Sequence, residues 1–298
     1  MHMRNNSERD FAAYPRRINA YKWYKLLLVG LLFVAFNVIA MFAIELITKL
    51  AFSVNVSSTG YDDMDFFTAA GAFNNGATAA VVIPCIILAA AIVKDRPLSS
   101  YFSSMGGWRW KVFLKTFVAG LIIVGIPTAL WYFLKGRTGD VVFSLGGFLI
   151  LTLFVPLQGI DEELLFRGFI MQTASSWFRL TAVGVIAQTV IFTLVHTYNI
   201  VGTISIAVSA VLYALVCLYS KGIESPSALH IFNNITQIYM AGIGYGFISS
   251  QQTVPETVFN LTLKVLFFLF ILYADRKLHW FDEVKYDDVA QFNSQRKG

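Results

Sequence analysis

Eight apolar stretches, each close to the length of a membrane-crossing helix, follow one another along this chain. A helix needs roughly 20 apolar residues to cross about 30 Å of hydrocarbon. With 56% hydrophobic and only 14% charged residues, the chain also has too few polar side chains to cover a water-soluble surface. We therefore predict an all-α, polytopic transmembrane helix bundle of about eight spans. The expected spans are 26–47, 78–93, 113–134, 143–160, 181–196, 201–219, 227–247 and 257–274.

Positively charged residues are distributed unevenly between the connections. They concentrate in the N-terminal tail, in the connection 94–115 and in the tail after Ala274, whereas a predicted external loop over 53–77 carries three aspartates. Because cytoplasmic loops of membrane proteins carry an excess of Lys and Arg, eight spans would place both termini in the cytoplasm. The net charge of +5 is therefore a topology signal, and we predict no nucleic-acid partner.

The segment 161–167, DEELLFR, places three acids and a base between apolar stretches. Such a residue at mid-membrane costs roughly 2.5–3.5 kcal/mol, so it faces the bundle interior, pairs with another charge or serves a function. Glu163 and Arg167 are four residues apart and can form an ion pair on one helix face. Glu162 lies about 100° further round the helix. We interpret Glu162 as the working carboxylate and the pair as its support.

Two of the four histidines, His196 and His230, lie in or at the ends of apolar segments. Phe192 precedes the first by one helical turn, and Asn234 follows the second by one turn. Either histidine alone could be a packing residue. Together, two imidazoles, a carboxylate and an amide supply a general base, a proton shuttle and hydrogen-bond donors. The pattern therefore predicts an active site within the membrane domain.

The ordered set EELLFR, FTLVH and HIFNN, over roughly 143–240, resembles the three motifs of the CPBP family, which comprises CAAX proteases and bacteriocin-processing enzymes. The resemblance implies an eight-helix fold and hydrolysis of a peptide bond close to the membrane. Thr-Leu-Val at 193–195 departs from the glycine-containing version often seen in the family. The implied catalytic residues are Glu162, His196, His230 and Asn234, and the implied supporting residues are Glu163, Arg167 and Phe192.

The resemblance also suggests how the chain is organised. We expect an integral protein of a bacterial plasma membrane whose partners are the lipid bilayer and a peptide or membrane-protein substrate. The predicted segments are a cytoplasmic tail over 1–24, N-terminal transmembrane helices over 25–140, a CPBP-like catalytic core over 141–250, and a last helix with a cytoplasmic tail over 251–298.

Two mechanisms use the same residues. In a metal-free version, which we prefer, Glu162 and His196 activate a water molecule while His230 and Asn234 donate hydrogen bonds to the oxyanion. In a metalloprotease version, Glu162, His196 and His230 hold Zn²⁺, and Glu163 serves as a base. The sequence does not choose between them.

Other classes of protein remain alternatives. A non-catalytic membrane binding protein or bacteriocin-immunity protein would use the same fold, and loss of Glu162 would then leave its activity unchanged. A transporter would also bury charges, but it usually shows internal repeats, and none is evident here.

The depth of His196 does not fit a simple topology. If the fourth span ends near residue 160 and the fifth starts near Leu180, Glu162 lies close to the cytoplasmic face. His196 then lies about 24 Å further along the fifth helix, toward the opposite face. We therefore expect an interfacial segment within 171–185, a broken span or a different span count.

Overall fold

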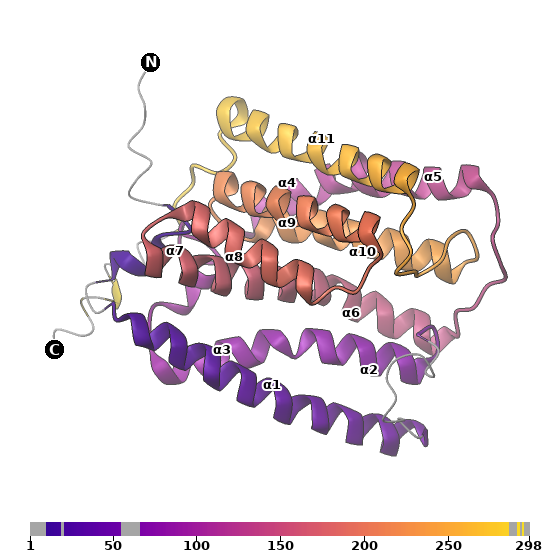
Figure 1. The fold of residues 1–298 in the computed structure, drawn as a ribbon, viewed down its shortest axis with the longest axis horizontal. Coiled ribbons are helices and arrows are strands. Elements are labelled where there is room, and N and C mark those ends of the chain that lie inside the picture. The colour runs from indigo at the N-terminus through magenta and orange to yellow at the C-terminus, as the bar shows by residue number, and fades with distance from the viewer. Residues whose placement is uncertain (1–9, 19–20, 55–65, 286–290, 293, 295–298) are drawn as a thin grey trace.

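The computed structural model describes residues 10–18, 21–54, 66–285, 291–292 and 294. In this part of the chain the regular structure is helical, apart from one antiparallel bridge between Ser103 and Gly222. The helices line up as eight rods in a single bundle (Figure 1). Their bounds are α1 Trp23–Phe52, α2 Ala69–Ala80, α3 Val82–Val93, α4 Trp110–Gly120, η5 Leu121–Gly125, α5 Ile126–Lys135, α6 Leu145–Glu163, η6 Leu164–Met171, α7 Gln172–Phe178, α8 Thr181–Leu194, α9 Ile200–Ser220, α10 Glu224–Gly242 and α11 Val254–Leu278, with short 3₁₀ turns η2 Tyr14–Arg17 and η4 Leu98–Tyr101.

Among the described residues, five rods are long and apolar enough to cross a bilayer, and α8 is a shorter apolar helix. Their outer faces expose large apolar side chains such as Phe42 and Leu134, as expected where lipid replaces water. The predictions of an all-α fold and of an integral membrane protein are thereby confirmed. The five are Trp23–Phe52, Ala69–Val93, Trp110–Lys135, Ile200–Ser220 and Val254–Leu278.

The helix that carries the acidic motif does not end near residue 160, so this expectation is wrong. α6 continues without a break through the π-helix η6 and through α7 to Phe178. Arg179, in the left-handed conformation with φ of 58°, then turns the chain into α8. Because Glu162 lies 17 residues before Arg179 and His196 lies 17 residues after it, both reach the same level of this helical hairpin. The conflict in depth therefore disappears.

The predicted loop over 53–77 is wrong in its second part, because α2 begins at Ala69. The Thr68 hydroxyl caps the helix by accepting a hydrogen bond from the Gly71 backbone N–H (3.1 Å). α2 then lies directly against α6, where a Cβ atom at Gly76 would come within 2.5 Å of Phe154 Cβ. The three aspartates of the predicted loop, at 62, 63 and 65, lie outside the described residues.

The first and last described segments lie at the same end of the bundle, where α7 turns into α8 (Figure 1). The Thr181 hydroxyl donates a hydrogen bond to Asp10 (3.2 Å), and Tyr14 and Ile18 pack with Phe292. An even number of rods returns the chain to the side from which it started.

Candidate active site

α6 and α10 approach each other closely at Gly159, about one turn before Glu162 and Glu163. A Cβ atom at this position would lie 2.9 Å from the backbone nitrogen and 2.7 Å from Cγ1 of Ile231. Because glycine has no Cβ, the two helices come close enough to place His230, the neighbour of Ile231, beside Glu163. This contact sets the spacing of the site.

We expect Gly159→Ala to destabilise the protein by about 1–3 kcal/mol, the usual effect of overpacking a close contact. The added methyl group must push Ile231 and its backbone away from α6. The measurement is the midpoint of unfolding by denaturant in detergent micelles. Gly139→Ala is the matched control, because no atom lies within 4 Å of the Cβ that it would add. Equal midpoints for the two variants would contradict this role for Gly159.

Glu163 and Arg167 form the ion pair that their spacing predicts. Arg167 Nη1 lies 3.1 Å from Glu163 Oε1, and neither side chain is exposed. The other guanidinium nitrogen, Nη2, donates to the backbone oxygen of Ala210 on α9 (3.2 Å). Glu163 Oε1 also accepts a hydrogen bond from Nδ1 of His230 (2.8 Å). The pair thus ties α6 to α9 and α10 and fixes the orientation of the His230 ring.

Glu162 faces the two histidines. Its Oε2 atom lies 3.6 Å from His230 Nε2 and 3.8 Å from His196 Nε2, and its side chain is 16% exposed. This oxygen is buried and accepts no hydrogen bond from the described residues. The other oxygen, Oε1, accepts a hydrogen bond from Gln158 Nε2, one turn earlier on α6 (3.3 Å). The structure therefore brings together side chains from α6, α10 and the end of α8.

The hydrogen-bond partners of the imidazoles decide what they present to Glu162. His196 Nδ1 lies 2.7 Å from the Phe192 carbonyl oxygen, which can only accept, so Nδ1 carries the proton. His230 Nδ1 likewise donates to Glu163. With neutral rings, both Nε2 atoms and Glu162 Oε2 are then three acceptors around one point. Binding in this space is therefore favourable for a molecule whose O–H or N–H groups donate hydrogen bonds to these acceptors.

Phe192 holds the ring of His196 in place. The two ring centroids are 4.5 Å apart, and the buried Phe192 ring also packs edge-on against Phe166 (4.7 Å). The guanidinium carbon of Arg167 also lies close to this ring, 4.9 Å from its centroid. The packing role expected for Phe192 agrees with these contacts.

The π-helix η6 begins directly after Glu163 and is held by Arg96. Arg96 donates to the backbone oxygen of Gly168 (3.0 Å) and to the side-chain oxygen of Gln172 (2.7 Å). π-helical turns are rare and frequently lie at functional sites. No sequence pattern indicated this turn, since the partners of Arg96 are far away in the chain.

Two tyrosines belong to the site although the motifs do not include them. Tyr213 of α9 lies with its ring 5.0 Å from that of His230, and Tyr198 stacks on His196 at 6.3 Å between centroids. Tyr198 lies in the α8–α9 connection, where burial raises the pKa of its phenol and the charge of Glu162 raises it further. Tyr198 could have been predicted from its position two residues after His196, whereas no sequence pattern pointed to Tyr213.

Asn234 lies one turn after His230 on α10, as predicted, but it does not join the cluster directly. Its side-chain oxygen accepts a hydrogen bond from Asn233 Nδ2 (3.0 Å). Among the described residues it makes no hydrogen bond to Glu162, His196 or His230. Its role therefore stays a prediction.

Two imidazoles and a carboxylate are a ligand set that Zn²⁺ uses. As they are arranged, they do not fit such an ion: Glu162 Oε2 lies 3.6 and 3.8 Å from the two Nε2 atoms, wider than the spacing of ligands about 2.0–2.1 Å from one tetrahedral Zn²⁺, and in the described ranges no group of three His, Cys, Asp or Glu side chains is placed to hold a metal.

Comparison with known families gives a match over part of the chain. Residues 142–236 match the family described as Type II CAAX prenyl endopeptidase Rce1-like, so this stretch carries a domain of that type. The matched range contains Glu162, His196, His230 and Asn234, and it falls within the core predicted over 141–250. The predicted resemblance is thereby confirmed. No curated protein and no solved structure matches the chain.

Proposed function

We propose that this protein is an intramembrane endopeptidase of the CAAX-protease type, in which Glu162 and His196 activate water to hydrolyse a peptide bond near the membrane. The observation that carries the proposal is Glu162 Oε2, which accepts no hydrogen bond from the described residues and lies within 4 Å of Nε2 of both His196 and His230. The peptidase family that residues 142–236 match supports the same reaction class.

A water molecule supplies the donor that the three converging acceptors lack. Held between Glu162 and His196, it donates a hydrogen bond to each and turns a lone pair toward the carbonyl carbon of the substrate. As its oxygen attacks, Glu162 accepts one proton. When the C–N bond breaks, that proton passes to the leaving nitrogen. The second proton of the water passes through His196 from the new carboxyl group to the amine. The products are a carboxylate and an ammonium group, and Glu162 and His196 return to their starting states.

His230 and Asn234 stabilise the oxyanion in this proposal. The hydrogen bond from Nδ1 to Glu163 orients the His230 ring, and His230 donates to the oxyanion once Nε2 has taken up a proton. Asn234 donates through Nδ2, while its side-chain oxygen remains bonded to Asn233. One such donor contributes about 10²–10³ in rate in enzymes that form tetrahedral intermediates.

We further propose that the eight rods are eight spans and that both termini lie in the cytoplasm. The connections at the end of the bundle where α7 turns into α8 carry Arg96 after α3, Arg179 between α7 and α8, and Lys221 after α9, as the positive-inside rule requires of the cytoplasmic side. Arg96 meets the α6 rod at Gly168, which is about 9 Å above Glu162 along the helix. The catalytic residues then lie within the membrane, farther from the cytoplasmic end of the bundle than Arg96 and Gly168.

The proposal is tested with purified protein in lipid vesicles that contain a library of membrane-anchored peptides. We expect new peptide termini, detected by mass spectrometry, with the wild-type protein and none with Glu162→Gln. A binding or immunity protein would leave every peptide intact in both samples, and that result would reject the protease.

We expect hydrolysis to persist after the protein is treated with chelators and passed into metal-free buffer. In the proposed mechanism Glu162 and His196 withdraw the proton without help. The measurement compares the initial rate before and after treatment, with metal content determined by mass spectrometry. A rate that falls with the metal content and returns on addition of Zn²⁺ would contradict the metal-free mechanism.

A further inference from the structure

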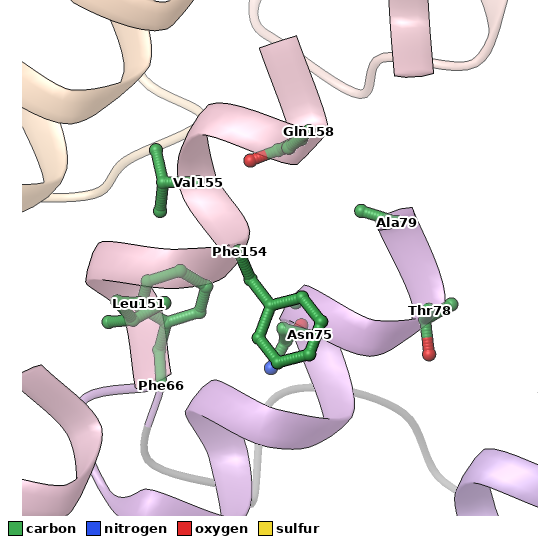
Figure 2. A pocket seen from close by; sticks show the side chains of 9 residues that line it. Phe66, Asn75, Thr78, Ala79, Leu151, Phe154, Val155 and Gln158 are labelled. Atoms are coloured by element: carbon green, nitrogen blue, oxygen red, sulfur yellow. The ribbon is translucent and has the colours of Figure 1, made fainter. Parts of the chain in front are cut away.

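A cavity of about 260 Å³ lies between α2 and α6. Figure 2 shows Asn75, Thr78 and Ala79 projecting from α2 and Phe154 and Gln158 projecting from α6 around this space. The remaining lining residues are Phe66, Gly76, Leu151 and Val155.

The cavity is connected to the catalytic site by one side chain. Gln158 lines it and also donates the hydrogen bond to Glu162 Oε1 (3.3 Å). Along α6, the lining residues Leu151, Val155 and Gln158 recur at helical spacing and continue the same stripe toward Glu162. The cavity and Glu162 therefore lie on the same face of α6, with Gln158 between them.

The size and the lining define the chemistry of the occupant. A cavity of about 150 Å³ accepts benzene, and sites for drug-sized ligands begin near 300 Å³. The space thus suits one large side chain. Phe66, Leu151, Phe154 and Val155 favour an apolar group, and no lining residue carries a charge that would pair with an ionised one.

We propose that this cavity binds one bulky apolar side chain of the peptide substrate, of the leucine, phenylalanine or tryptophan class. The inference rests on the proposed protease function. Val155 lies seven residues before Glu162, which is about 10 Å along the helix. An extended peptide advances about 3.3 Å per residue. The bound side chain therefore lies two to three residues from the bond that is cleaved.

The test uses the full-length protein in lipid vesicles with a set of membrane-anchored peptides that differ in one residue, placed in turn at each position near the cut. The residue is Gly, Ala, Leu, Phe, Trp or Asp. Ala79→Phe fills the cavity from α2, and Ala80→Phe is the matched control, since Ala80 is the next residue and does not line the cavity. For each peptide, kcat/KM is measured with the wild-type protein and with both variants.

We expect the wild-type protein to prefer Leu, Phe or Trp over Gly by about tenfold or more at a position two or three residues from the cut. Ala79→Phe should remove this preference while still cleaving the Gly peptide, and Ala80→Phe should keep it. If Ala79→Phe lowered kcat/KM equally for all peptides, the cavity would hold lipid or only support the fold, and this result would overturn the inference. Unchanged selectivity in Ala79→Phe would also overturn it while leaving the protease intact. No cleavage by the wild-type protein would overturn both.

Discussion

Glu162→Gln is expected to lower kcat/KM for peptide hydrolysis by about a hundred- to ten-thousandfold, the usual contribution of a general base. Glutamine keeps the size of the side chain and can still accept the hydrogen bond from Gln158, but it cannot take a proton from water. The measurement is the cleavage rate of a membrane-anchored peptide, together with the unfolding midpoint in micelles.

The matched control is Glu45→Gln. Glu45 is a carboxylate within a membrane helix, exposed on α1, so its loss should leave the cleavage rate unchanged. An unfolding midpoint close to that of the wild-type protein would separate lost chemistry from lost structure. Retention of more than about a tenth of the wild-type rate by Glu162→Gln would mean that another residue is the general base, because loss of a general base normally lowers the rate at least about a hundredfold.

Arg167→Met is expected to destabilise the fold by about 3–5 kcal/mol, because it leaves the buried Glu163 carboxylate without its cation. The substitution also removes the hydrogen bond to the Ala210 carbonyl. Unfolding by denaturant in micelles measures the change, and a low yield of folded protein is the accompanying sign. A destabilisation below about 1 kcal/mol would mean that Glu163 is neutral or is satisfied by His230 alone.

The double variant Glu163→Gln with Arg167→Met separates the structural role of the pair from its effect on His230. With both charges gone, much of the lost stability should return, because no unpaired ion stays buried. Cleavage should remain low, because an amide accepts the hydrogen bond from His230 Nδ1 less strongly than the Glu163 carboxylate does and so orients the ring less firmly toward Glu162. Recovery of full activity in the double variant would show that the pair serves the fold alone.

The fold class followed from the sequence because the bilayer imposes simple rules of length and polarity. Apolar runs near 20 residues marked the rods, and the i, i+4 spacing of Glu163 and Arg167 correctly indicated their ion pair. The motif order also brought out Glu162, His196 and His230, and the structure places Nε2 of both histidines within 4 Å of Glu162 Oε2.

The errors came from features that depend on contacts between distant segments. The acidic motif interrupts the hydropathy, so the fourth span was predicted to end there, although the helix continues to Phe178 against neighbours that bind its polar groups. Similarly, the Gly- and Asn-containing stretch around Gly76 was predicted to be a loop. It is helical because small residues allow α2 to lie against Phe154. Tyr213 also lies in the site, beside His230, although its helix α9 carries none of the three motifs.

The central claim, that Glu162 drives hydrolysis of a peptide bond at the membrane, is tested most directly by comparing the membrane proteomes of cells with the wild-type protein and with Glu162→Gln at equal levels. New protein termini near predicted membrane segments should appear only with the wild-type protein. Identical sets of termini, with both proteins folded and present in the membrane, would contradict the claim.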